Sequence, residues 1–328
     1  MSQTFVRRAT WAACLLLTAL GAAGTAHAQG KNVYVSSEKD QKVYVFNTQG
    51  ERVSAIDTCK RPRHMMFSRD NQQLLVLCGD SNELGIIDVA SSKMTGTLPV
   101  GDSPDQFDLS PDGKTVYVSI EDENVMSAYD MASKKKLFDV KTGGEPEGVF
   151  VMPDGKTAFV TSEVANVVHV VDLQQQKTVK NVKVGQRPRR FVLADKDSLW
   201  VSNELGASVT ILDPNTYAIK KTIEFKVPGM RESDITPVGM VMSADGKTMW
   251  VGLGRANHVA EVDVASASVR NLILAGKRAW GVALHPDGKT LYVVNGLSDD
   301  MTMIDTATSK ATKTVPVGRV PHAVIVQP

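Results

Sequence analysis

The stretch Asp112-Gly113-Lys114-Thr115 is repeated along the chain, each time just before a short apolar segment. Further copies begin at Asp154, Asp245 and Asp287, and degenerate copies lie at Asp70 and Asp195. This order of residues favours a tight hairpin turn, because Asp caps the turn locally and Gly supplies a positive φ. The spacings from Asp70 onward are 42, 42, 41, 50 and 42 residues. Such a regular period in a chain of short strands predicts sheets stacked in a closed ring.

One repeat, residues 102–141, contains four short strand-like segments separated by turn signals, which is the pattern of one β-propeller blade. The second strand occurs seven times, as Val33-Tyr34-Val35, Leu75-Val76-Leu77, Val116-Tyr117-Val118, Ala158-Phe159-Val160, Leu199-Trp200-Val201, Met249-Trp250-Val251 and Leu291-Tyr292-Val293. The chain ends, at residues 317–326, with a first strand that has no blade of its own. We therefore expect an all-β, seven-bladed propeller of four-stranded blades, closed when the C-terminal strand joins the N-terminal blade.

The first residues follow the pattern of a secretory signal peptide. Arg7 and Arg8 precede an apolar segment, and Ala26-His27-Ala28 is a small-x-small cleavage motif. We expect residues 1–28 to be removed after Ala28, leaving residues 29–328 as a single propeller domain in the periplasm. Cleavage removes 2 of the 37 basic residues, so 35 remain against 36 acidic residues. This balance argues against a nucleic-acid partner, and the apolar segment is too short for a good membrane anchor.

Over its whole mature length the chain resembles the YVTN-type β-propeller repeat proteins. The resemblance rests on Val35-Ser36-Ser37-Glu38-Lys39-Asp40, Gln186-Arg187-Pro188-Arg189-Arg190-Phe191, Gly254-Arg255-Ala256-Asn257-His258-Val259, Ala279-Trp280-Gly281, Asn295-Gly296 and Val317-Gly318-Arg319-Val320-Pro321. Within that group it is most similar to periplasmic propellers associated with catabolism that depends on pyrroloquinoline quinone (PQQ). The resemblance implies an accessory role in PQQ-dependent alcohol or aldehyde oxidation. It implies PQQ or another small anionic molecule as ligand, or a periplasmic quinoprotein dehydrogenase or cytochrome as partner.

The chain lacks the sequence features of the dehydrogenase itself. It has no CxxCH haem motif and no vicinal cysteine pair, and one of its four tryptophans, Trp11, lies in the leader. It also has no GxSxG or HExxH signature of a hydrolase. These absences favour a non-enzymatic binding or scaffold protein.

The residue after the repeat proline defines a candidate site, because the first strand of each blade lines the central channel. The seven such residues, one per blade, are Arg63, Asp105, Glu147, Arg189, Val238, Trp280 and His322, with His64, Arg190, Lys277 and Arg319 beside them. Guanidinium groups pair with carboxylates and an indole offers a stacking face, so this ring suits a planar anionic ligand. It equally suits docking on a charged protein surface, and the same charges also fit an ordinary solvated loop rim.

A second ring of residues follows the second strands and consists of Glu38, Glu121, Glu163 and Glu204. Carboxylates around a channel could hold Ca²⁺, which takes about six to eight oxygen ligands. The sequence has no DxDxDG loop, however, and one Glu per blade could instead bond the adjacent blade. Together with Asn203 and Asn257, these residues also allow an alternative function, a metal-assisted, lactonase-like hydrolase.

Two cysteines, Cys59 and Cys78, remain after cleavage of the leader. They flank one predicted strand pair of the same blade, at positions that lie on the same face. In an oxidising compartment we expect them to form a disulfide. Two free thiols, or a metal pair with His64, are the alternatives.

Overall fold

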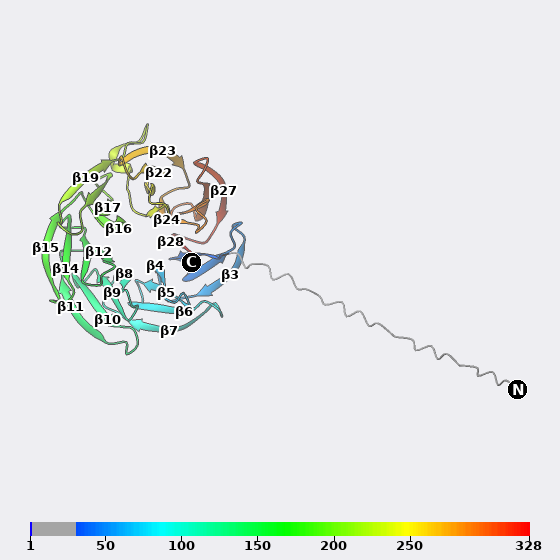
Figure 1. Cartoon of the computed structure of the whole chain (residues 1–328), viewed down its shortest axis with the longest axis horizontal. Coiled ribbons are helices and arrows are strands. Elements are labelled where there is room, and N and C mark those ends of the chain that lie inside the picture. Colours follow the sequence, from blue (N-terminus) through cyan, green and yellow to red (C-terminus); the bar gives the residue numbers. More distant parts are fainter. Residues whose placement is uncertain (2–30) are drawn as a thin grey trace. The chain divides into compact units, whose positions relative to one another are not determined.

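The computed structural model describes Met1 and residues 31–328, so the predicted cleavage site after Ala28 lies outside the described residues. Residues Lys31–Pro328 form one compact unit. It consists of seven four-stranded antiparallel sheets arranged as a ring, as Figure 1 shows. The predicted seven-bladed propeller is confirmed.

The blades are numbered here from the N-terminus, and the strands of each are given from the innermost outward. Blade 1 is β28 (Pro321–Val326), β1 (Val33–Ser37), β2 (Lys42–Phe46) and β3 (Arg52–Asp57). Blade 2 is β4 (Pro62–Phe67), β5 (Gln73–Cys78), β6 (Glu83–Asp88) and β7 (Lys93–Pro99). Blade 3 is β8 (Pro104–Leu109), β9 (Thr115–Ile120), β10 (Val125–Asp130) and β11 (Lys136–Lys141). Blade 4 is β12 (Pro146–Val151), β13 (Thr157–Ser162), β14 (Val167–Asp172) and β15 (Lys177–Lys183).

Blade 5 is β16 (Pro188–Asp195), β17 (Ser198–Asn203), β18 (Ser208–Leu212) and β19 (Ile219–Glu224). Blade 6 is β20 (Met240–Met242), β21 (Thr248–Gly252), β22 (His258–Asp263) and β23 (Ser268–Leu274). Blade 7 is β24 (Ala279–Leu284), β25 (Thr290–Asn295), β26 (Asp300–Asp305) and β27 (Lys310–Pro316). A 3-10 turn, η1 (Glu232–Asp234), lies between blades 5 and 6 in the sequence. Within residues 31–328 no helix has the length and apolarity needed to cross a bilayer.

The C-terminal strand closes the ring as predicted. Strand β28 pairs antiparallel with β1, with Val326 opposite Val33 and Val324 opposite Val35. It therefore supplies the innermost strand of a blade whose other three strands come from the start of the domain. This pairing leaves no open sheet edge at the junction of the two ends.

The repeated tetrapeptide forms the hairpin turn that its composition predicts. Asp112 accepts hydrogen bonds from the Ser110 hydroxyl at 2.6 Å and from the backbone N–H of Lys114 at 3.1 Å. Gly113 has a φ of 72°, in the left-handed region that glycine adopts without strain. The turn is thus stabilised locally, and each copy starts the second strand of its blade at the same place.

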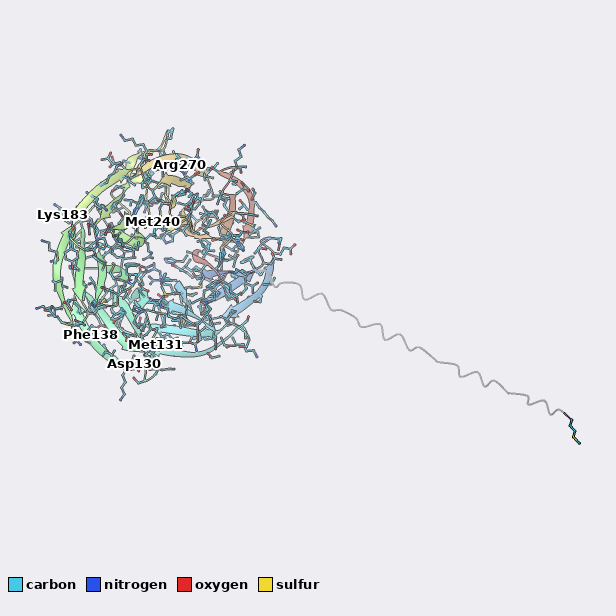
Figure 2. All side chains as sticks on the ribbon, viewed as in Figure 1. Asp130, Met131, Phe138, Lys183, Met240 and Arg270 are labelled. Atoms are coloured by element: carbon cyan, nitrogen blue, oxygen red, sulfur yellow. A yellow bond between two sulfur atoms is a disulfide. The ribbon has the colours of Figure 1, made fainter. Side chains whose placement is uncertain are left out.

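The core of the unit lies between neighbouring blades. One cluster joins blades 1 and 2 through Tyr34, Val45, Met65 and Leu74, each at most 2% exposed. Each blade has an apolar surface on both faces and buries it against its two neighbours. In Figure 2, Met240 of an innermost strand lies toward the middle of the ring and Lys183 lies at its periphery. The innermost strands therefore surround the channel, and their side chains determine what it can bind.

The predicted disulfide is present. Cys59 and Cys78 are bonded, with their Cα atoms 5.7 Å apart. Cys78 is the last residue of β5 and Cys59 precedes β4, so the bond ties the loop before the innermost strand of blade 2 to the end of its second strand. Because both sulfur atoms are in the disulfide, the two alternatives, free thiols and a metal pair with His64, do not apply.

Candidate functional site

Each innermost strand begins after the same kind of turn. The residue before its first position has a left-handed φ, for example 56° at Arg61, 54° at Arg187 and 61° at Arg278. Such angles are uncommon for residues other than glycine. Here the carbonyl of that residue accepts a hydrogen bond from the loop after the second strand, as in Glu204 N to Arg187 O at 2.8 Å. The two kinds of loop therefore lie together on one face of the ring, which we call the loop face.

A β-bulge follows this turn and sets the direction of the site residues. The pairing of the innermost strand with its neighbour shifts register between Pro62 and Met65, Pro104 and Phe107, Pro146 and Val149, Pro188 and Phe191, and Ala279 and Val282. A bulge bends the strand and re-aims its side chains. In blade 4 the bulge contains Gly148, where a Cβ atom would overlap the carbonyl oxygen of Arg189 in blade 5. Glycine therefore allows the two strands to approach closely.

Of the seven residues predicted at the channel mouth, Arg63, Asp105, Glu147, Arg189 and Trp280 lie at these bulges, His322 lies at a similar register shift between β28 and β1, and Val238 precedes β20; six of the seven are buried. The six are Asp105, Glu147, Arg189, Val238, Trp280 and His322, while the side chain of Arg63 is 17% exposed. Charged side chains are buried at this depth only when they are paired. The residues of the channel mouth therefore form a buried, paired cluster. They do not form the ordinary solvated loop rim that was one alternative from the sequence.

Five of the charged side chains form an ion-pair network that we call the inner tier. Arg63 pairs with Asp105, and Arg189 pairs with Glu147. Arg190 donates to Glu147 at 3.0 Å and lies 3.5 Å from Asp105. Because Asp105 is in blade 3 and Arg190 in blade 5, the network crosses the channel as well as linking neighbours. The inner tier contains three guanidinium groups and two carboxylates.

Three glutamates of the second ring cover the inner tier from the loop face. Glu38 accepts a hydrogen bond from Arg63 at 3.0 Å, and Glu204 accepts one from Arg189 at 2.6 Å. Glu163 lies 2.8 Å from Arg189 and also pairs with Arg187. Burial raises the pKa of Glu163 to about 8, despite the opposing charge of Arg187. Together the two tiers form a connected set of ion pairs at the loop-face end of the channel, which we call the polar layer.

The four glutamates predicted as weak Ca²⁺ ligands are thus engaged with other groups. Glu38, Glu163 and Glu204 pair with arginines, and Glu121 accepts a hydrogen bond from the Ser103 hydroxyl at 3.2 Å. Within residues 31–328, no three side chains of His, Cys, Asp or Glu are grouped as a metal site requires. In this structure three of the four carboxylates therefore pair with arginines, and Glu121 pairs with a serine hydroxyl.

The two asparagines considered for a hydrolase have structural partners. Asn203 donates to Ser208 Oγ at 3.1 Å and to Thr210 Oγ1 at 3.0 Å. The side-chain oxygen of Asn257 accepts a hydrogen bond from the backbone N–H of Arg278 at 2.9 Å. Both side chains hold the loop-face turns in place.

Beneath the polar layer the channel contains a cavity of about 190 Å³. Its polar lining comes from His64, Gln106, Arg190, Trp280 and His322. Within residues 31–328, Nε1 of Trp280 and Nδ1 of His322 are fully buried and have no hydrogen-bond partner. Buried polar atoms are normally satisfied, so these two atoms beside a cavity are groups that a water molecule or a ligand in the cavity would satisfy.

Both imidazoles of the cavity are neutral at ordinary pH. Burial, reinforced by the charge of Arg190, lowers the pKa of His64 to about 3. Burial and the charges of Arg63 and Arg190 lower the pKa of His322 well below 6.5. Burial alone would raise the pKa of Asp105, but Arg63 and Arg190 hold it well below its usual value. The cavity is therefore lined by a guanidinium and neutral donors, beside ionised carboxylates that are already paired.

The indole of Trp280 does not offer a free stacking face. The guanidinium of Arg278 lies 3.9 Å from the centre of its ring, and that of Arg189 lies 5.7 Å from it. Cation–π contacts of this kind hold the ring in place. Trp280 thus contributes a fixed N–H group to the cavity wall.

Two residues that we predicted at the channel mouth, Lys277 and Arg319, lie elsewhere, and one residue that lines the cavity, Gln106, was not predicted. Lys277 is exposed, and Arg319 bonds Asp40 at 2.7 Å on the loop face outside the cavity. Gln106 was missed, although it occupies the same repeat position as His64 and Arg190, at spacings of 42 and 84 residues. Its amide contacts Nδ1 of His64 at 3.3 Å.

The fold and the site together define a β-propeller with a polar layer at one end of its channel and a donor-lined cavity beneath. A family model described as YNCE-like beta-propeller matches residues 100–285, more than half of the chain. The chain belongs to this family. A search among curated proteins found no match.

Several solved structures are similar to this one. A periplasmic gluconolactonase from Pseudomonas aeruginosa is 19% identical with a TM-score of 0.76, covering 91% of this chain and 99% of its own. A hydrazine synthase chain from Kuenenia stuttgartiensis is 22% identical with a TM-score of 0.74, covering 85% and 93%. A dihydro-heme d1 dehydrogenase is 14% identical with a TM-score of 0.68, covering 89% and 74%. At these identities the likeness establishes the fold alone.

Proposed function

We propose that this protein is an exported, non-enzymatic binding protein that holds a small carboxylated molecule in its channel. The observation that carries the proposal is the cavity beneath the polar layer, with two buried polar atoms, Trp280 Nε1 and His322 Nδ1, that have no partner within residues 31–328. A ligand that accepts hydrogen bonds would satisfy these groups. A concave site with a few convergent polar groups is the usual form of a small-molecule binding site.

The charge of the site favours an anion. Arg190 is a guanidinium group in the cavity wall itself, whereas the carboxylates of the two tiers are paired with arginines and do not line the cavity. The two imidazoles are neutral, so they add donors or acceptors without competing for a negative charge. Charge-assisted hydrogen bonds to a carboxylate are shorter and stronger than neutral ones.

The resemblance supplies the metabolic setting. It supports an accessory role in PQQ-dependent oxidation of alcohols or aldehydes, with a quinoprotein dehydrogenase or a cytochrome as the proposed partner. The disulfide between Cys59 and Cys78 agrees with an oxidising compartment such as the periplasm. PQQ itself carries carboxylates and is the first ligand to test.

The test is calorimetric titration of PQQ into the purified protein, with and without Ca²⁺. The full chain is expressed with its own leader, and the mass of the product reports cleavage after Ala28. Trp280→Phe removes the cavity N–H, whereas Trp250→Phe removes an equally buried, unpartnered N–H that is not part of the cavity wall. Saturable binding that weakens about tenfold or more in Trp280→Phe, and not in Trp250→Phe, supports the proposal. The absence of binding heat both with and without Ca²⁺ refutes PQQ as the ligand.

A second function, docking of a partner protein on the loop face, has an observation of its own. Val164, Leu205 and Leu297 occupy the same repeat position after the second strand and are 65%, 45% and 64% exposed. They lie in the loops after β13, β17 and β25, in blades 4, 5 and 7, so a partner that docks on the loop face would contact them. Replacing all three with Ser should abolish binding of a purified partner dehydrogenase or cytochrome while leaving the calorimetric result unchanged.

The hypothesis of a metal-assisted hydrolase stays an alternative because solved structures of similar fold include a gluconolactonase. It requires that Glu163 or Glu204 be released from its arginines to hold a metal. Hydrolysis of a gluconolactone that depends on added metal and is lost in Glu204→Gln would establish it. No activity above that of buffer with Ca²⁺, Mg²⁺ or Zn²⁺ would remove it.

A further inference from the structure

A second and larger cavity adjoins the first. It has a volume of about 580 Å³ and shares His64, Gln106, Arg190 and Phe191 with the cavity beneath the polar layer. The rest of its wall is mostly apolar and includes Met66, Phe107, Phe150 and Met152. The shared residues form the boundary between a polar inner chamber and an apolar outer one.

The larger cavity lies toward the face opposite the loop face. Its wall includes Pro111 and Pro153, which begin the hairpin turns of blades 3 and 4. These turns join the first and second strands, at the end of the channel away from the ion-pair network. On the loop face, by contrast, Asp105, Glu147 and Arg189 are buried within that network. The open approach to the chamber is therefore from the hairpin-turn face.

The polar groups at the boundary leave donors for a ligand. Within residues 31–328, the side chain of Arg190 contacts acceptors through Nη1, at 3.0 Å from Glu147 and 3.5 Å from Asp105, and its Nε and Nη2 make no hydrogen bond. The Gln106 amide contacts His64 at 3.3 Å and retains a second N–H. A carboxylate placed here would meet a guanidinium and an amide from two blades, with the imidazole of His64 neutral beside them.

The wall of the larger cavity also carries one acidic side chain, Asp108. Its two oxygens accept hydrogen bonds from the backbone N–H groups of Leu109 at 2.7 Å and Val151 at 2.8 Å, and Arg69 lies 3.7 Å away. The Asp108 carboxylate therefore joins blades 3 and 4 through these hydrogen bonds. It is not free to bind a cationic group of a ligand. The remaining lining is suited to an apolar or aromatic body.

We propose that the channel takes up an amphipathic monocarboxylic acid from the hairpin-turn face, its carboxylate at Arg190 and Gln106 and its body between Phe107, Phe150 and Phe191. The proposal rests on the proposed function and narrows its ligand. Aldehyde oxidation yields carboxylic acids, so the ligand belongs to the product class of the reaction that this protein is proposed to serve. A bipartite cavity with an apolar chamber and a charged inner end distinguishes such an acid from both an alcohol and a small dianion.

Trp280 provides the reporter for the test. Residues 31–328 contain three tryptophans, and replacing Trp200 and Trp250 with Phe leaves Trp280 as the only one in the propeller; excitation at a wavelength where tyrosine does not absorb reports its indole. The probes are benzoate and hexanoate, compared with benzyl alcohol and hexan-1-ol, which lack the charge, and with oxalate, which lacks the apolar body. We expect saturable fluorescence changes with the two monocarboxylates at concentrations at least tenfold below those needed for the other probes.

Substitutions test the apolar chamber and the polar end of the cavity separately. Phe150→Ala opens the apolar chamber, and Phe138→Ala, at another half-buried phenylalanine on the outermost strand β11, is its matched control. Gln106→Leu removes the amide at nearly constant volume, so it tests the polar end even if Arg190→Met fails to fold. Affinity for benzoate should fall about tenfold or more in Phe150→Ala and in Gln106→Leu and stay unchanged in Phe138→Ala.

The results distinguish binding of a monocarboxylic acid from the broader proposed function, binding of a small carboxylated molecule. Oxalate or the alcohols binding as tightly as the monocarboxylates would overturn the inference. PQQ binding without any response to the monocarboxylates would overturn it and leave the proposed function standing. Failure of PQQ and of every carboxylate would remove both. Monocarboxylate binding that Phe150→Ala and Gln106→Leu do not weaken would move the ligand out of this cavity and refute the assignment.

Discussion

Arg189 and Glu147 form a buried ion pair although they are 42 residues, one full repeat, apart. The same spacing separates Arg63 from Asp105. The innermost strands of neighbouring blades lie side by side, so equivalent repeat positions meet across each blade junction. In this channel the blades are therefore joined by side-chain charges as well as by the apolar core between them.

The first prediction concerns the stability of this network. Arg189→Met should lower the free energy of unfolding by about 3–5 kcal/mol, because it leaves buried carboxylates without their partner. Lys136→Met, which breaks the exposed pair with Asp139, should change it by no more than about 0.5 kcal/mol. Urea unfolding followed by circular dichroism measures both. Equal losses in the two variants would show that the channel charges do not stabilise the fold.

The second prediction concerns the disulfide. Cys59→Ser/Cys78→Ser should reduce the free energy of unfolding by about 3 kcal/mol, because the bond restricts the unfolded chain over a loop of this length. Adding a reductant should lower the unfolding midpoint of the wild type and leave that of the double variant unchanged. A wild-type midpoint that reductant does not move would mean that the bond contributes nothing.

The third prediction concerns mildly acidic pH. The folded protein holds the pKa of His64 near 3 and that of His322 well below 6.5, mainly through burial. In the unfolded chain both protonate near the usual value of about 6.5, so the unfolded state binds more protons below that pH. These two histidines should therefore make the fold less stable as the pH drops from 7 toward 5. The raised pKa values of Glu163, about 8, and Asp108, about 6, act in the opposite direction, so the histidine effect is measured as a difference between the wild type and a histidine variant.

The check is the unfolding midpoint at pH 7, 6 and 5 for the wild type and for His64→Gln. The variant has one fewer imidazole to protonate on unfolding, so its stability should fall less over this range, by up to about 1.4 kcal/mol for each pH unit below 6.5. Parallel curves for the two proteins would contradict the assignment of a neutral, buried His64.

The fourth prediction concerns the bulge in blade 4. Gly148→Ala should destabilise the fold by about 1–3 kcal/mol, because its Cβ would overlap the backbone oxygen of Arg189 and push two innermost strands apart. Gly96→Ala is the control, since a Cβ there meets only the flexible end of Lys134, at 3.5 Å. If thermal denaturation finds Gly148→Ala as stable as the control, the strands can move apart without cost.

Part of the candidate site was predictable from the repeat alone. Arg63, Trp280 and His322 were found because one repeat position per blade reaches the channel, and His64 and Arg190 were found because each directly follows a residue at that position. Gln106 has the same periodic signal as His64 and was missed because it is neither charged nor aromatic. Lys277 and Arg319 were placed at the mouth by proximity in sequence, but the turn before each innermost strand directs them to the outside of the loop face.

The sequence by itself determined the number of blades, the closure of the ring and the position of the disulfide. These features depend on turns and strand alternation, which are local and are repeated often enough to be unambiguous. The tertiary structure alone decided that the rings of charge pair with each other, that Arg278 covers Trp280, and that two cavities of different polarity meet at Arg190. Those relations depend on side-chain directions and distances between blades, which a period along the chain does not contain.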